Sequence, residues 1–260
     1  MNKSLIALAL VGAFASPVFA ADTDVAPTPV HSVTGNLALV TNYVFRGISQ
    51  SQNHAAIQGG FDYSHVSGLY AGTWASNVSW VTRSDYSAKD NNSMELDIYG
   101  GYKGAFADDF SYDVGFIKYY YPGTLNGNPT PDSVEAYAGI AWKFISLKYN
   151  YSLSEYLFGW SSLSGQNNRG SGYIDLSMNY DLGDGWGVNA HAGHQRIKNN
   201  SDASYTDWKL GVTKDLGVGV VGLAYTDTNA NTCGDSNATY CWNNKDVAKG
   251  GAFLSFSKTF

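Results

Sequence analysis

Apolar and polar residues alternate along much of the chain, and this pattern predicts β-strands. In the segment 145–153, every second residue is apolar, from Ile145 through Leu147 to Leu153, and the residues between them are Ser, Lys and Asn. Successive side chains of a strand point to opposite faces, so a segment of this kind has one apolar and one polar face. The segments 94–98, 110–116 and 174–180 repeat the pattern. An all-β fold follows from these segments.

The same pattern, followed from end to end, predicts about twelve strands. No obvious turn residue separates Phe144 from Ile145, where two of these strands meet. The expected strand ranges are 35–46, 54–65, 68–78, 93–103, 109–120, 133–143, 145–153, 172–182, 186–197, 205–215, 218–227 and 249–260.

The connections between the expected strands are alternately short and long. Short connections lie at 66–68, 104–108, 183–185 and the Gly217 corner, after even-numbered strands. Long polar connections follow odd-numbered strands, at 79–92, 121–132, 154–171 and 228–248. Short periplasmic turns and longer extracellular loops are typical of outer-membrane barrels. The expected fold is therefore a closed antiparallel transmembrane β-barrel of about twelve strands, located in the bacterial outer membrane.

The two ends of the chain carry features of export and assembly. Lys3 precedes an apolar run that is too short to span a bilayer, and Val18 and Ala20 form a cleavage pattern. We therefore predict a signal peptide over 1–20, a flexible lead-in over 21–33 and the barrel over 34–260. The alternating final segment ends on Phe260 and resembles the C-terminal signal recognised by the bacterial barrel-assembly machinery, although Lys258 departs from that pattern.

Composition agrees with a membrane barrel and excludes some partners. Charged residues make up 15% of the chain, aromatic residues also 15%, and mean hydropathy is only −0.22. A barrel exposes every other residue to outer-membrane lipid, which dilutes its hydrophobicity. The net charge of −6 argues against a nucleic-acid partner. Cys233 and Cys241 predict a disulfide within one loop, since the segment offers no further ligands at metal-binding spacing.

The first expected strand contains the phrase Asn42-Tyr-Val-Phe-Arg-Gly-Ile-Ser-Gln50, and the segments 56–63 and 68–78 follow it. Together they resemble the TorF-type (Gcw_chp) family of proteobacterial outer-membrane porins. The similarity covers nearly all of the expected mature chain. It implies an outer-membrane channel, but the substrates of the family are largely undefined, so it supports the fold and compartment more than the solute.

Charged side chains recur on the polar register and are the candidates for lining the lumen. Arg46 lies where the first strand meets its outer loop; it could join a charge ring that selects anions or positions a ligand, or it could pair structurally with a carboxylate. The inward acids outnumber the inward bases, which predicts mild cation preference if the lumen is a narrow water-filled pore rather than filled by internal pairing. The candidates are Arg46, Asp62, Glu95, Asp97, Asp113, Glu135, Lys148, Asp175 and Lys209.

Other reactive or aromatic residues give weaker signals. His191 and His194 are three apart on a strand and point to opposite faces, so they are not expected to share a metal. No nucleophile motif is recognisable, and no cofactor is implied. Tyr119 and Tyr137 fall on the lumen register, whereas the tryptophans are expected at the membrane interfaces as Trp74, Trp80, Trp142, Trp160, Trp186, Trp208 and Trp242.

The function predicted from these features is passive, weakly selective passage of small hydrophilic solutes, without enzymatic activity. Two alternatives remain open at this point. One is a non-conducting structural or adhesion barrel that acts through its extracellular loops. The other is an outer-membrane hydrolase, because catalytic sites are known on many unrelated folds.

Overall fold

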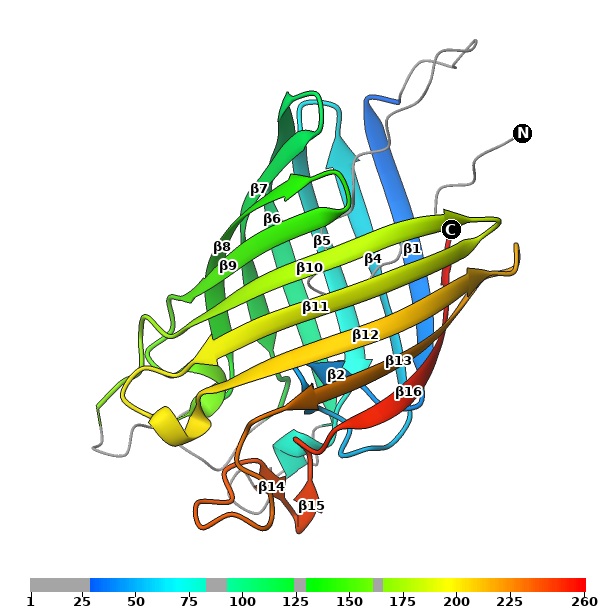
Figure 1. The fold of residues 1–260 in the computed structure, drawn as a ribbon. Helices are drawn as coiled ribbons and strands as arrows, with labels where there is room; N and C mark the ends of the chain where they lie inside the picture. The colour runs from blue at the N-terminus through cyan, green and yellow to red at the C-terminus, as the bar shows by residue number, and fades with distance from the viewer. Residues whose placement is uncertain (1–28, 83–92, 124–129, 161–165) are drawn as a thin grey trace.

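The alternating segments form the wall of a closed antiparallel barrel in the computed structural model, which describes residues 29–82, 93–123, 130–160 and 166–260 (Figure 1). Each strand pairs with its neighbours, and pairing of the first wall strand with the last closes the barrel. The predicted fold class and the twelve wall strands are confirmed. In chain order they are β1 (His31–Val40), β4 (Ala56–His65), β5 (Leu69–Asn77), β6 (Met94–Ala107), β7 (Phe110–Tyr120), β8 (Ser133–Trp142), β9 (Ile145–Ser152), β10 (Gly172–Gly183), β11 (Trp186–Arg196), β12 (Tyr205–Asp215), β13 (Val220–Thr228) and β16 (Gly251–Thr259).

Short turns gather at one end of the barrel and long loops at the other (Figure 1). The unclear division between β8 and β9 is a turn at Lys143 and Phe144, with Lys143 at a φ of 52°. The last residue, Phe260, lies at the short-turn end, where its amide donates to the Gly35 carbonyl at 2.8 Å. β1 begins at His31, three residues before the predicted boundary, and the predicted signal peptide lies outside the described residues.

The outward faces of the wall strands carry a band of large apolar side chains. Leu147 on β9 and Leu176 on β10 belong to this band, and Leu176 is 52% exposed. Near the short turns the band includes exposed aromatic residues, among them Trp142 and Trp186. A band of apolar residues edged by aromatic rings matches the hydrocarbon core and interface of a membrane. No helix in the described ranges is long and apolar enough to cross a bilayer.

The first wall strand is shorter than predicted. A single strand over 35–46 was expected, but β1 ends at Val40, and two residue pairs then form a small hairpin from β2 (Val44–Phe45) and β3 (Ile48–Ser49). Arg46 and Gly47, at φ values of 48° and 76°, make the turn between them. Two successive residues with positive φ are typical of tight hairpin turns, in which glycine is favoured because it lacks a Cβ. We call residues 44–49 the inner hairpin.

The long loops pack together around an aromatic core at their end of the barrel. The cluster includes Ile48 of the inner hairpin and Tyr43 just before it, Trp80 and Tyr121 from two loops, and Tyr240 from a third. The loop 229–250 contributes β14 (Cys241–Trp242) and β15 (Lys245–Asp246), and it carries the predicted disulfide between Cys233 and Cys241. The short 3-10 helices η1 (Trp80–Thr82), η3 (Leu157–Gly159) and η4 (Ser201–Ala203) also lie in the loops. We call this cluster of loop side chains the outer cap.

Candidate functional site in the barrel lumen

The inner hairpin crosses the lumen and touches the opposite wall. A Cβ placed on Gly47 would lie 2.5 Å from the Cβ of Asp207 on β12, which is closer than real Cβ atoms approach a neighbour. Only a glycine therefore lets the tip approach β12 this closely. The base of the hairpin is held by the loops, since the Ser49 amide donates to the Val247 carbonyl at 2.8 Å.

Arg46, at the hairpin tip, is fixed by three groups from the far wall. Its guanidinium donates to both carboxylate oxygens of Glu135 on β8, at 3.0 and 2.7 Å, and to the side-chain oxygen of Gln195 on β11 at 2.8 Å. It also stacks over the Tyr173 ring, 4.4 Å from the centroid. The side chains of Arg46 and Glu135 are only 6% and 0% exposed. Burial by itself would lower the pKa of Arg46, but the adjacent Glu135 carboxylate outweighs it and the pKa is raised.

A buried pair of acids lies on β6, near the outer cap. The hydroxyls of Tyr43 and Tyr121 donate to the two oxygens of Glu95 at 2.9 and 3.0 Å. Asp97, two residues along the same face, has no hydrogen-bond partner among the residues that the structure describes. Both side chains are almost inaccessible to solvent. These two predicted lumen residues face inward as expected, but side chains cover them.

Tyrosine rings pair with the remaining acids on this side of the lumen and fill space beside glycines. The Tyr99 hydroxyl donates to Asp62 at 2.6 Å, and the Tyr70 hydroxyl donates to Asp113 at 2.5 Å. The ring of Tyr173, on the other side, occupies the position that a Cβ of Gly193 would take. Beside Gly193, therefore, a ring and not open space faces the lumen.

The wall formed by β9 to β12 carries closely spaced groups of both signs, which we call the charged wall. His191 on β11 lies between two carboxylates, with Nδ1 2.6 Å from Asp175 and Nε2 3.0 Å from Asp207. Lys148 on β9 stacks over the Tyr137 ring at 4.0 Å, and Lys209 lies opposite His191 on β12. The structure therefore brings together Lys148, Asp175 and Lys209, three of the predicted lumen residues.

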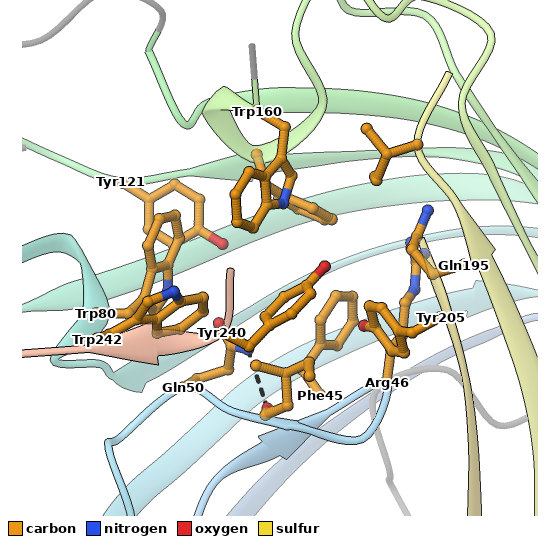
Figure 2. A pocket seen from close by; sticks show the side chains of 13 residues that line it. Phe45, Arg46, Gln50, Trp80, Tyr121, Trp160, Gln195, Tyr205, Tyr240 and Trp242 are labelled. Atoms are coloured by element: carbon orange, nitrogen blue, oxygen red, sulfur yellow. Dashed lines mark hydrogen bonds between the residues drawn. The ribbon is translucent and has the colours of Figure 1, made fainter. Parts of the chain in front are cut away.

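Two cavities meet at the inner hairpin, and Arg46 lines both. The outer cavity, of about 50 Å³, is walled by aromatic rings from the outer cap, including Trp80, Tyr121 and Trp160 (Figure 2). The inner cavity, of about 170 Å³, is bounded by the hairpin and the charged wall. The hairpin and its arginine thus separate an aromatic compartment from one in which charged and apolar side chains both line the space.

Several residues of the site were not predicted from the sequence. Asp207 precedes Lys209 by two positions on a strand, so the period-2 pattern could have found it. Gln195 and His191 carry no comparable local signal as partners, because their contacts come from other strands. In the described ranges, no group of three or more acidic, histidine or cysteine residues could hold a metal ion.

The prediction that the tryptophans form interface girdles is correct only in part. Trp142, Trp186 and Trp208 are exposed on the outer surface. Trp74 instead lies buried in the lumen, and Trp80 and Trp242 belong to the outer cap. Their local sequence does not distinguish these environments, because loops that fold inward can bury a ring as effectively as a bilayer. Tyr119 and Tyr137 are buried within the barrel.

A closed barrel with a lipid-facing apolar band and a polar interior defines the class of outer-membrane β-barrels. The model of a family described as bacterial proteins of unknown function (Gcw_chp) matches residues 24–260. The chain therefore belongs to the Gcw_chp family, and the predicted resemblance is confirmed. No curated protein matches the sequence.

Solved structures of porins share the fold at low sequence identity. The KdgM porin aligns over 87% of this chain and 98% of its own, with a TM-score of 0.53 and 5% identity. The NanC porin has the same coverage and TM-score at 12% identity. A structure of the KdgM porin in complex with disordered oligogalacturonate aligns over 89% of this chain and 98% of its own, with a TM-score of 0.51 and 6% identity.

Proposed function

We propose that the protein is an outer-membrane channel for passive, weakly selective passage of small hydrophilic solutes. The observation that carries the proposal is the inner cavity, which lies inside a closed barrel and is lined by charged side chains. A polar, hydrated interior is the usual construction of a channel barrel. The KdgM complex with oligogalacturonate supports passage of a hydrophilic solute through a barrel of this fold.

The inner hairpin is the constriction of this channel. Its tip reaches β12, and its arginine is bound to β8 and β11. A solute that passes along the axis must displace the hairpin or move around it. The hairpin lies within the phrase 42–50 through which the sequence resembles its family, and its Arg46-Gly47 turn is the part that reaches the opposite wall.

The arrangement of His191 argues against its use as the general base of a hydrolase in the lumen. Both of its ring nitrogens lie within hydrogen-bond distance of carboxylates in the described structure, so neither is directed at a serine or cysteine. A general base needs one nitrogen within reach of the proton it removes. The adhesion alternative is less favoured because many loop aromatic residues are buried in the outer cap rather than displayed.

Planar-bilayer recording of the purified, refolded protein tests the channel proposal. We expect small, discrete current steps from the natural sequence. A variant in which residues 44–49 are replaced by two glycines should conduct severalfold more, because the constriction is removed. A matched control shortens the turn 216–219 at the opposite end of the barrel and should conduct like the natural protein.

Absence of current from both the natural protein and the hairpin variant, with the barrel folded, would contradict the channel proposal. Equal currents from the natural protein and the hairpin variant would leave a channel but exclude the hairpin as its constriction. Folding is checked by migration on unheated detergent gels, since closed barrels satisfy their backbone hydrogen bonds and resist unfolding.

The C-terminal strand is proposed to be the segment recognised by the barrel-assembly machinery. β16 alternates and is followed by Phe260, whose ring is exposed at the short-turn end. Deletion of Phe260 should reduce the amount of folded protein in the outer membrane. Substitution of Lys258 by Ala should not reduce it, since this residue already departs from the apolar pattern.

A further inference from the structure

We infer that the inner cavity binds a small carboxylate anion and that the open channel prefers anions to cations. The binding part of this inference stands on the geometry of the cavity, whereas the conduction part rests on the proposed channel function. Both follow from which charged groups reach the cavity and which do not.

The charges that line the inner cavity are mostly basic. Arg46, Lys148 and Lys209 line it together with His191, and Asp175 is the acid among the lining residues. The inward carboxylates of Glu95, Asp97, Glu135 and Asp207 are at most 2% exposed, and they are not among the lining residues. A solute in the cavity therefore contacts more positive groups than negative groups.

The carboxylates nearest the cavity are engaged by protein donors. Glu135 is bound at both oxygens by Arg46, and Asp175 lies against His191 and also accepts from the Ser177 hydroxyl. One oxygen of Asp207 accepts from the Tyr173 hydroxyl at 3.0 Å, and the other lies 3.0 Å from the second nitrogen of His191. Carboxylates held in this way are less available to attract a cation from solution, because their oxygens already accept hydrogen bonds.

Lys209 is the lining base that is least engaged by the protein. Its side chain lines the cavity and lies within electrostatic range of Asp175 and Asp207, but within the described parts of the chain it forms no hydrogen bond or ion pair at contact distance. An ammonium group without a hydrogen-bond acceptor is costly to remove from water, so water or an anion must solvate it. Lys148 and Arg46 line the same cavity, but Arg46 is already paired with Glu135, and carboxylates that include Asp113 also lie within electrostatic range of Lys148. A carboxylate in this space would be attracted mainly by Lys209, with Lys148 and Arg46 nearby.

This conclusion differs from a simple count along the sequence. Inward acids outnumber inward bases, which predicts mild cation preference when each residue is weighted equally. The structure separates buried acids from bases that line the cavity, and an ion in transit is solvated by the groups it contacts. An ion in the inner cavity touches more basic than acidic side chains, so the cavity favours anions.

Calorimetric titration of the detergent-folded protein with acetate tests the binding site. We expect acetate to bind the natural protein, and Lys209→Met to weaken that binding about ten- to a hundredfold, the loss typical of one charged contact. Lys209→Arg keeps the charge and should retain binding. The matched control is Lys214→Met on the same strand, because the Lys214 ammonium donates to the Asp184 carbonyl at the short-turn end, at 2.6 Å.

Equal acetate affinity in the natural protein and Lys209→Met would overturn the site, as would equal losses in Lys209→Met and Lys214→Met. Binding of inorganic phosphate without acetate would overturn its assignment to carboxylates. Because titration does not require conduction, these results are independent of the channel proposal.

Reversal potentials in a potassium chloride gradient test the selectivity. We expect chloride to be more permeant than potassium, and the double variant Lys148→Met, Lys209→Met to lose that preference. A preference for potassium in the natural protein would overturn the selectivity part of the inference. A folded protein that binds acetate at Lys209 but passes no current would overturn the channel function and leave the anion site standing.

Discussion

The outer cap and the charged wall occupy the same barrel but are built by different physical rules. The outer cap packs aromatic and aliphatic side chains from separate loops, as the core of a soluble protein does. The charged wall arranges lysines, carboxylates and a histidine around a cavity. Arg46 lies at the boundary and lines the cavities on both sides.

The difference indicates that obstruction of the lumen by the inner hairpin, here called closure of the pore, and solute preference are separable properties of this protein. Closure depends on packing and on the contacts of one hairpin, so it should respond to substitutions that change volume or break the Arg46 contacts. Solute preference depends on which charges face the cavity, so it should respond to substitutions that change charge at constant size. The following substitutions test the two regions, from the largest expected effect to the smallest.

Loss of the Arg46 side chain should have the largest effect. Arg46→Ala leaves the buried Glu135 carboxylate with the Tyr119 hydroxyl but without its ionic partner, and loss of one partner of a buried ion pair typically costs about 3–5 kcal/mol. We expect that cost as a lower free energy of unfolding in urea and as more frequent open events in bilayers. The matched control is Arg169→Ala, because Arg169 pairs with Glu155 at 3.9 Å on the exposed surface. If the two variants lose equal stability, the hairpin is not held by this pair.

Arginine at Leu176 should have the next largest effect, and it tests the inward register of the charged wall. Leu176 faces outward, and an arginine facing lipid near the bilayer midplane costs about 2–4 kcal/mol. Ser177→Arg, one residue along the same strand, points inward and should cost less. Urea unfolding in lipid vesicles measures both, and the reverse order would place the charged groups on the lipid side.

Removal of one buried hydroxyl from the outer cap should have a moderate effect. The Tyr240 hydroxyl donates to the Ala203 carbonyl at 2.6 Å, and the ring is buried. Tyr240→Phe keeps the packing and should lower the free energy of unfolding by about 1 kcal/mol, the usual contribution of one hydrogen bond. Tyr180→Phe on the exposed outer face serves as the control and should be nearly neutral. Anion preference should be unchanged in both variants, since neither residue lines the inner cavity.

Removal of the disulfide should have the smallest effect on the barrel. Cys233 and Cys241 are eight residues apart, so their bond constrains one short segment of a single loop. The double variant Cys233→Ser, Cys241→Ser should change the unfolding free energy of the wall by less than about 0.5 kcal/mol, the range usual for surface changes. Thiol labelling before and after reduction confirms the bond in the natural protein. A large loss of wall stability would show that the loop supports the barrel.

Much of the wall could be predicted because its signal is local. The parity of Ile145, Leu147 and Leu153 assigns a face to each residue without knowledge of any partner strand, and a shift by one residue would reverse every side chain. The lengths of the connections likewise distinguish the two ends of the barrel in the sequence. The first strand was predicted to end six residues too late because the apolar residues Val44 and Phe45 continue an alternating pattern after the chain has left the wall.

The lumen could be predicted only in part. Glu95, Asp97 and Glu135 were assigned inward, and the structure buries them, but the tyrosines that cover Glu95 come from other parts of the chain. Arg46 was expected at a strand end near the pore mouth, and the structure places it across the lumen. Its two possible roles, as a selectivity residue and as a structural partner, cannot be distinguished from a sequence that does not show Glu135 and Gln195 beside it.

The sequence by itself determined the alternation of faces, the order of strands and turns, and the membrane-facing surface, because each depends on residues a few positions apart. Tertiary structure alone decided where the inner hairpin lies, which acids are covered and which bases reach the inner cavity. These features depend on contacts between residues far apart in the chain, such as Arg46 and Gln195, which are 149 residues apart. Barrel closure brings such residues together, and no local pattern records the distance between them.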